Sequence, residues 1–369
     1  MRIEILEKRE NFIKITKNTL KNSTFFNEIE FSVEQNYYLN KYLNFIASEN
    51  LPDKVFQILV NEYSSSLNYK KKLFQYLYVK LSISSSFRKI FSHETVLLPA
   101  IFNNYLILGG NHRLRLFSTE LTSTHVLLKF NERNTYILND IALRNKFNLP
   151  YAPKILNFGK DWIEEEYFEG TPINRLRDEG LRKKILKEVV LNHEKLLILK
   201  SVESVSKEIY FFNLKKEIDL ILYSKRINVE YPLIELINKT FNLLKKNIKF
   251  KKIDVSWSHG DFHQANILVR NKSFRVIDWE ASDKRFYLYD YFILMSGLRV
   301  HLSIEKGVNR FYTESRCLIN KDSYDSDTIN LLLLEELRFN INEQFSVNFF
   351  KSGFNTSNLC HSVLKFLEK

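Results

Sequence analysis

Several residue types and patterns are scarce in this chain of 369 residues. It contains 9 glycines and 6 prolines, which excludes collagen-like architectures and long Gly/Pro-rich linkers. Its longest apolar runs, such as 331–334, are about four to six residues, whereas a membrane-spanning helix needs about 20. The N-terminal stretch MRIEILEKRENFIK carries charges where a secretion signal needs an apolar segment. We therefore expect neither a transmembrane helix nor secretion by that route.

Cysteine is also scarce, because the chain has only Cys317 and Cys360. Two thiols cannot build a multi-bridge framework or a four-thiolate zinc site. We expect both to be reduced packing residues, which is typical of a cytoplasmic protein.

Aromatic and basic residues are abundant. Hydrophobic residues make up 44% of the chain and aromatic residues 14%, which excludes wholesale disorder. The length predicts two or three domains. The net charge of +12, from 55 basic and 43 acidic residues, favours anionic partners such as nucleotides, nucleic acid, phosphosugars or acidic lipid surfaces.

The composition and the apolar periodicity of the sequence change twice, which predicts three regions, 1–95, 96–169 and 170–369. The first reads as mainly helical, with expected helices over 31–48, 51–67 and 69–80. The helix over 69–80 carries lysines between aromatic groups. A solvated face over a local core explains this pattern better than contact with nucleic acid or a membrane surface.

The second region is rich in short segments of branched and aromatic residues, which are typical of strands. Expected strands are 96–102, 105–108, 113–118, 125–130, 155–156 and 162–167, with one helix over 134–147. This order predicts a small twisted sheet with one helix rather than a series of βαβ units. After Gly170, a candidate hinge, the pattern is helical over 180–199, 213–223 and 232–246, and again from 279 to the C-terminus. A strand-rich island over 256–278 interrupts it.

That island carries the polar residues most suggestive of chemistry. It reads SHGDFHQANILV over 258–269 and, after a turn at 271–273, FRVIDWE over 274–280. The apolar runs 267–269 and 274–277 predict a tight hairpin. Asp261 and Asn266 precede its first strand and Asp278 ends its second, so the hairpin would bring two carboxylates and one amide oxygen together.

Such an oxygen set suits phosphoryl transfer. Mg²⁺ prefers hard oxygen ligands and keeps water and phosphate ligands, so Asn266 and Asp278 can be sufficient protein ligands. A second carboxylate, that of Asp261, can orient an attacking hydroxyl and accept its proton. His259 and His263 are four residues apart, and a helical zinc pair is conceivable. However, Gly260 and the following strand argue against a helix there, so structural roles are favoured for both histidines.

HGDFHQAN followed by VIDWE resembles the signature of the aminoglycoside phosphotransferase and choline kinase superfamily, which are small-molecule kinases. The resemblance implies an α+β, bilobal protein-kinase-like fold with a small antiparallel-sheet N-lobe and a mainly helical C-lobe, here preceded by the mostly helical extension. It also implies ATP and Mg²⁺ as cofactors, Asp261 as catalytic base, Asn266 and Asp278 as Mg²⁺ ligands, and His259 as a residue that shapes the loop. Asp290 matches a later family aspartate that braces the catalytic loop.

The same resemblance extends to the small lobe. Gly109, Gly110 and Asn111 resemble a glycine-containing turn whose backbone amides can meet nucleotide phosphates. Lys129 matches the lysine that contacts the α- and β-phosphates. Its expected acidic partner is Asp140, where the family usually has Glu. Adenine would lie on backbone groups near Glu166, Tyr167 and Phe168, in the segment that crosses between the lobes.

Two functional readings remain open at this point. The first is an ATP-dependent O-phosphotransferase whose acceptor is a hydroxyl of a small molecule, such as a sugar, an amino alcohol or a cell-envelope precursor. The basic charge mildly disfavours polycationic aminoglycosides. The alternative is a non-catalytic kinase-like protein whose positive surface binds nucleic acid, an acidic membrane surface or a protein partner.

Overall fold

The computed structural model describes residues 12–26, 33–63, 69–84, 86–110, 112–224, 229–300, 303–319, 324–345 and 355–368. The chain forms two compact units. The first contains residues 1–142 and 153–171, and the second contains residues 143–152 and 172–369. The predicted domain division at residues 95 and 169 stays a prediction.

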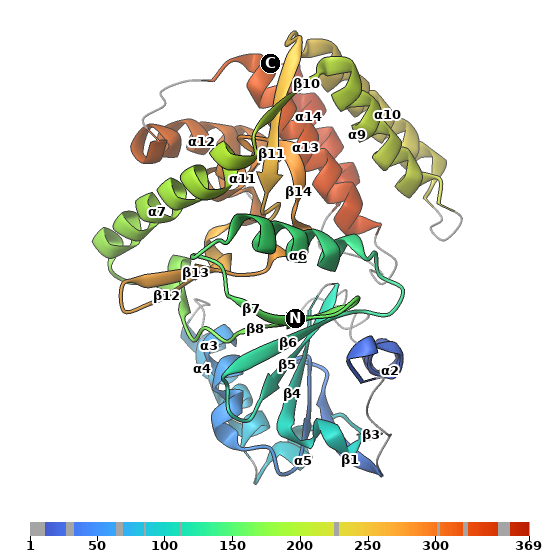
Figure 1. The fold of residues 1–369 in the computed structure, drawn as a ribbon, viewed down its shortest axis with the longest axis vertical. Coiled ribbons are helices and arrows are strands. Elements are labelled where there is room, and N and C mark those ends of the chain that lie inside the picture. Colours follow the sequence, from blue (N-terminus) through green and yellow to red (C-terminus); the bar gives the residue numbers. More distant parts are fainter. Residues whose placement is uncertain are drawn as a thin grey trace. The chain divides into compact units, whose positions relative to one another are not determined.

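The first unit is built on an eight-stranded antiparallel sheet (Figure 1). In spatial order its strands are β3 (Glu94–Pro99), β1 (Glu34–Asn40), β2 (Phe45–Ser48), β4 (Tyr105–Gly109), β5 (Arg113–Ser118), β6 (Ser123–Leu128), β8 (Trp162–Glu166) and β7 (Ile155–Phe158). The strands predicted for the 96–169 region are therefore confirmed, except that residues 100–104 form the 3-10 helix η3 (Ala100–Asn104).

Both faces of this sheet carry apolar side chains, because successive residues of a strand point to opposite faces and both sets include apolar residues. Leu39 and Ile107 belong to a cluster on one face, and Phe45 and Leu108 to a cluster on the other. The helical elements of the unit are α2 (Phe12–Asn22), η1 (Thr24–Phe26), η2 (Asp53–Phe56), α3 (Gln57–Tyr63), α4 (Tyr69–Ile83), α5 (Arg88–Phe91) and the beginning of α6 (Thr135–Phe147). The helices predicted over 51–67, 69–80 and 134–147 are thus largely confirmed in type, except that residues 64–67 lie outside the described residues.

The helix predicted over 31–48 is wrong, because residues 34–48 form the hairpin of β1 and β2. The side chain of Asn40 accepts hydrogen bonds from the amides of Tyr42 and Leu43, which closes the turn. Asn44 then adopts a left-handed conformation with φ of 54°. Turn chemistry at two asparagines therefore outweighs an apolar pattern that also fits a helix.

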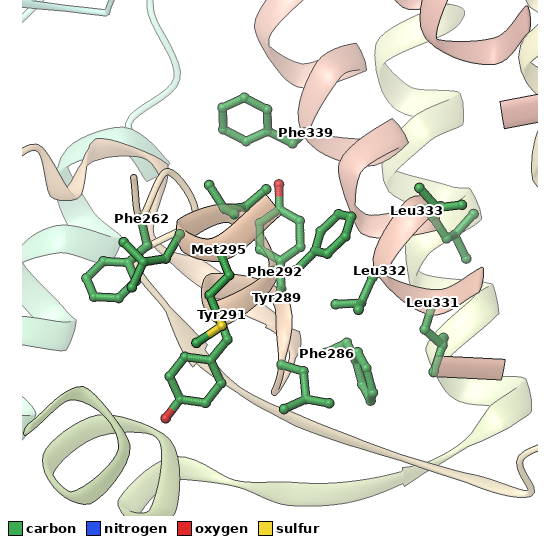
Figure 2. Packing of buried hydrophobic residues seen from close by; sticks show 14 of the residues in the cluster. Phe262, Phe286, Tyr289, Tyr291, Phe292, Met295, Leu331, Leu332, Leu333 and Phe339 are labelled. Atoms are coloured by element: carbon green, nitrogen blue, oxygen red, sulfur yellow. The ribbon is translucent and has the colours of Figure 1, made fainter. Parts of the chain in front are cut away.

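The second unit is mainly helical around one large hydrophobic core. Its helices are α7 (Glu179–His193), α8 (Leu199–Ser201), α9 (Lys207–Leu222), α10 (Tyr231–Asn247), α11 (Tyr289–Ser296), α12 (Ile304–Ile319), α13 (Ser326–Gln344) and α14 (Thr356–Leu367), with the π-helical turn η5 (Glu194–Ile198) between α7 and α8. Figure 2 shows aromatic side chains of α11, including Tyr289 and Phe292, packed beside leucines of α13. This contact fixes α11, which carries Asp290, against the longest helix of the unit.

Two small groups of strands interrupt the helices of this unit. Strand β11 (Lys252–Ser258) lies between β10 (Glu203–Ser206) and β14 (Asp283–Phe286), and β12 (Ile267–Arg270) pairs with β13 (Ser273–Val276). The strand-rich island and its hairpin are therefore confirmed. Within the part of the chain that the structure describes, no helix has the length and apolarity needed to cross a membrane.

Candidate active site

The candidate catalytic loop follows strand β11 and begins with a sharp turn at Gly260. Gly260 has φ of 83°, and a Cβ placed on it would lie 2.1 Å from the carbonyl oxygen of Ala281. Both the positive φ and the close approach require glycine here. The turn leads into the short 3-10 helix η6 (Gln264–Asn266) and then into β12.

Asp290 anchors this loop from α11. Its carboxylate accepts hydrogen bonds from the amides of His259 at 2.7 Å and Gly260 at 3.0 Å. It also contacts Nε2 of His193, from α7, at 2.8 Å. Burial by itself would raise the pKa of Asp290, but the hydrogen bond and charge of His193 outweigh this effect and lower it. The contacts fit the bracing role expected for Asp290.

The imidazole of His259 is fixed inside the loop by both ring nitrogens. Nδ1 accepts from the amide of Asp261 at 3.3 Å, and Nε2 lies 2.8 Å from the carbonyl oxygen of Ile277. One accepting and one donating nitrogen define a neutral ring, and burial accordingly lowers the pKa of His259. Both nitrogens are engaged by groups of the protein, so the contacts fit a loop-shaping role.

The carboxylate of Asp261 lies between two donors. Oδ1 accepts from Nε of Arg299 at 3.1 Å, and Oδ2 lies 3.4 Å from Nε2 of His263. Nδ1 of His263 accepts from the amide of Ala265, so Nε2 carries the hydrogen that faces Asp261. Burial opposes ionisation of Asp261, but the hydrogen bond from His263 and the charge of Arg299 prevail and lower its pKa. An ionised carboxylate that retains 27% side-chain exposure can accept a hydrogen bond from an incoming hydroxyl.

The β12–β13 hairpin joins the remaining two candidate residues. Its turn residues Asn271 and Lys272 both have positive φ, as a type I′ turn requires. At the open end the amide of Ile277 donates to the carbonyl oxygen of Asn266 at 2.9 Å. Asp278 follows directly, in a left-handed conformation with φ of 70° and ψ of 53°. Asn266 and Asp278 are therefore brought to the same end of the hairpin.

Asn266 is also tied to Asp261. Its Nδ2 donates to the backbone carbonyl of Asp261 at 3.0 Å, which directs the amide nitrogen inward and leaves the oxygen as the atom that can act as a ligand. Among the residues that the structure describes, no group of three or more His, Cys, Asp or Glu side chains is placed to hold a metal ion. Two oxygen ligands suit Mg²⁺, which takes its other ligands from phosphate and water, whereas they would not make a zinc site.

In the first unit, Lys129 and Asp140 each have a partner that the sequence did not indicate. Lys129 is the first residue after β6, and its Nζ donates to the carbonyl oxygen of Gly110 at 2.5 Å. Asp140 accepts from Nη1 of Arg113 at 2.8 Å, and both side chains are buried. The expected pairing of Lys129 with Asp140 stays a prediction.

The glycine turn differs from the expectation in its hydrogen bonding. The amide of Gly109 donates to the carbonyl oxygen of Asn44 at 3.1 Å, and the amide of Gly110 donates to that of Arg113 at 2.9 Å. A phosphate contact through either amide would have to compete with these bonds. Asn111 lies outside the described residues.

The segment proposed to hold adenine begins at the end of β8. The amide of Glu166 donates to the carbonyl oxygen of Lys154 at 2.9 Å, and that of Tyr167 donates to Thr122 at 3.2 Å. These two amides are therefore used within the first unit. The role of Glu166, Tyr167 and Phe168 in nucleotide binding stays a prediction.

Sequence reasoning missed three residues that contact the candidate site residues. His193 is 97 residues from Asp290, Arg299 is 38 from Asp261, and Arg113 is 27 from Asp140. None lies in a motif, and each is brought to its partner by packing of separate elements. A buried position for a basic residue is the only signal that could have pointed to them, and it requires a structure.

Comparison with known proteins gives one match to a family model. Residues 225–310 match the phosphotransferase enzyme family, and this segment contains the catalytic loop, the hairpin and Asp290. The resemblance predicted from the sequence is thus confirmed for this segment, which is similar to the phosphotransferase enzyme family. No curated protein sequence matches the chain.

Several solved structures resemble the fold. Choline kinase LicA from Streptococcus pneumoniae has 14% identity and a TM-score of 0.49, covering 71% of this chain and 92% of that one. Ethanolamine kinase from Plasmodium vivax has 15% identity and a TM-score of 0.42, covering 84% and 92%. A thermostable mutant of aminoglycoside phosphotransferase APH(4)-Ia, in complex with ADP and hygromycin B, has 13% identity and a TM-score of 0.47, covering 71% and 93%.

Proposed function

We propose that the protein is an ATP- and Mg²⁺-dependent O-phosphotransferase that moves the γ-phosphate to a hydroxyl group of a small molecule. One observation carries this proposal. Asn266 is hydrogen-bonded both to Ile277, which precedes Asp278, and to the backbone of Asp261, so it links the three candidate residues. All three lie within the residues that match the phosphotransferase family.

Each residue has a distinct task in this proposal. Asp261 accepts a hydrogen bond from the acceptor hydroxyl and orients its oxygen toward the γ-phosphate. Its lowered pKa favours orientation over early proton removal, which suits a loose transition state with little covalent demand on the base. The amide oxygen of Asn266 and the carboxylate of Asp278 would hold Mg²⁺, which neutralises phosphate charge when bound. Lys129 would contribute positive charge to the α- and β-phosphates.

An acceptor screen tests this proposal. Consumption of ATP is followed against panels of sugars, amino alcohols and cell-envelope precursors, with the Asp261→Ala variant as the blank. Asp254→Ala is the matched control, because Asp254 is an exposed carboxylate on β11 outside the catalytic loop. We expect turnover with at least one hydroxyl compound by the wild type and Asp254→Ala, and none above background by Asp261→Ala.

Two results would contradict the proposal. Normal turnover by Asp261→Ala would remove Asp261 from its role. Binding of ATP with Mg²⁺ but no turnover of any acceptor would favour the non-catalytic alternative instead.

A further inference from the structure

Arg299 is a buried cation that touches the candidate catalytic carboxylate and lies outside the catalytic motif. It belongs to the 3-10 helix η8 (Leu298–Val300), which follows α11, and its side chain is 8% exposed. Nε donates to Oδ1 of Asp261 at 3.1 Å. This hydrogen bond restrains the carboxylate of Asp261, so the contacts that hold Arg299 also determine the position of that carboxylate.

Other side chains besides Asp261 hold the guanidinium of Arg299. Nη1 donates to Oε1 of Glu336 at 2.7 Å, and Nη2 donates to the hydroxyl of Tyr289 at 3.1 Å. The Tyr289 hydroxyl in turn donates to Oε2 of Glu336 at 2.9 Å, which closes a ring of hydrogen bonds. The guanidinium also lies 3.7 Å from the centre of the Phe339 ring. In Figure 2 the Tyr289 hydroxyl points toward the side of the core where Phe339 lies.

In this arrangement each of the three guanidinium nitrogens donates to a different acceptor. Glu336 and Tyr289 are buried, and Nδ2 of Asn340 donates to Oε1 of Glu336 at 2.9 Å. The anchor is therefore built from α11 and α13, two helices of the core, and not from a surface loop. Nε donates to the candidate catalytic carboxylate.

The backbone around Arg299 is also constrained. Gly297 ends α11 in a left-handed conformation with φ of 68°, so the chain turns sharply before η8. A Cβ on Gly307 of α12 would lie 2.5 Å from Cδ2 of Leu298, so the glycine lets α12 pass close to η8. Both glycines thus help to place the residue that contacts Asp261.

We propose that Arg299 is a positioning residue that sets the orientation of the Asp261 carboxylate through its buried anchor on Glu336 and Tyr289. This inference rests on the role proposed above for Asp261. Arg299 holds Oδ1 while Nε2 of His263 faces Oδ2, so the carboxylate plane is defined from both sides. A preset plane spares the active site the cost of orienting the base when the acceptor arrives.

Arg299→Lys is the informative variant, because lysine keeps the charge that compensates Glu336 but offers one nitrogen instead of three in a fork. Arg285→Lys is the matched control. The side chain of Arg285 is 5% exposed, its Nη1 pairs with Glu335 of α13 at 3.4 Å, and it lies over the Tyr289 ring at 5.1 Å, but its partners do not include Asp261. Both variants should lose similar amounts of thermal stability.

With an acceptor from the screen above, we expect Arg299→Lys to lower kcat by about 100-fold and leave the KM for ATP unchanged, as a misplacement of about 1 Å can do. Arg285→Lys should keep the kcat of the wild type. A kcat of Arg299→Lys close to that of Arg285→Lys would overturn the inference, because charge compensation alone would then explain Arg299.

Crystal structures of both variants give a readout that does not depend on turnover. We expect the Asp261 carboxylate to rotate away from its place in Arg299→Lys and to stay in Arg285→Lys. An unmoved carboxylate in Arg299→Lys would overturn the inference. If the wild type turns over no acceptor while the carboxylate moves as expected, the proposed function fails and the positioning of Asp261 by Arg299 stands.

Discussion

Asp290 offers the most quantitative test of how the catalytic loop is held. Its Oδ2 faces both His193 Nε2 and the amide of His259, whereas Oδ1 faces the amide of Gly260 alone. In Asp290→Asn the new amide oxygen can keep the two contacts of Oδ2, and the amide nitrogen then faces the Gly260 amide. One buried donor loses its acceptor, so we expect a loss of about 1–3 kcal/mol in the free energy of unfolding. Asp290→Ala removes all three contacts and should cost about 3–5 kcal/mol.

Urea denaturation followed by tryptophan fluorescence and by far-UV circular dichroism measures both losses, and coincident transitions are required for the comparison. Asp327→Ala is the matched control. Asp327 is a buried carboxylate of α13 that accepts from the amides of Lys249 and Phe250, outside the catalytic loop. We expect it to lose stability without losing turnover, whereas both Asp290 variants lose turnover in conditions where they are folded. The reasoning would be refuted if Asp290→Asn were as stable as the wild type. It would also be refuted if Asp327→Ala were as inactive as Asp290→Ala.

Three further perturbations have defined outcomes. If Asp278 binds the metal, Asp278→Ala should weaken ATP binding by about 10-fold or more when calorimetry is done with Mg²⁺. In EDTA the variant and the wild type should bind ATP with the same affinity. Gly260→Ala should prevent a stable fold or lower the melting temperature strongly, because its Cβ would collide with the carbonyl of Ala281; a melting temperature equal to that of the wild type would contradict the turn geometry. Burial lowers the pKa of His259 from its usual 6.5. As the pH falls below about 6.5, His259 is therefore protonated more readily in the unfolded state than in the folded state, and the free energy of unfolding decreases. His259→Gln should therefore show a shallower loss of stability between pH 6.5 and 5 in urea titrations, and an unchanged slope would contradict a buried neutral ring.

The catalytic hairpin was predictable because its signals are local. Apolar runs, the turn at 271–273 and the polar residues at its ends lie within about 20 residues of sequence, and the turn residues have the positive φ that a short hairpin needs. The placement of Asn266 and Asp278 at one end of the hairpin follows from that geometry. The strands of the 105–166 region were predictable for the same reason, since short segments of branched and aromatic residues are local signals.

The contacts that hold the loop were not predictable, because they join residues far apart in the chain. His193 reaches Asp290 from α7, and Arg299 connects Asp261 to Glu336 of α13. No spacing rule relates such positions, and only packing of the core brings them together. The prediction for the β1–β2 hairpin was wrong for a different reason. The eight apolar residues between 37 and 47 fit a helix as well as two strands.

The order of strands in the large sheet has a consequence for N-terminal truncation of the protein. Strands β1 and β2 lie between β3 and β4, so a fragment beginning at residue 96 would lack the neighbour that covers one side of β4. An exposed strand edge flanked by uncovered apolar clusters is an aggregation hazard. Strands β1 and β2 are thus integral to the sheet of the first unit, and a stable fragment of this unit has to retain them.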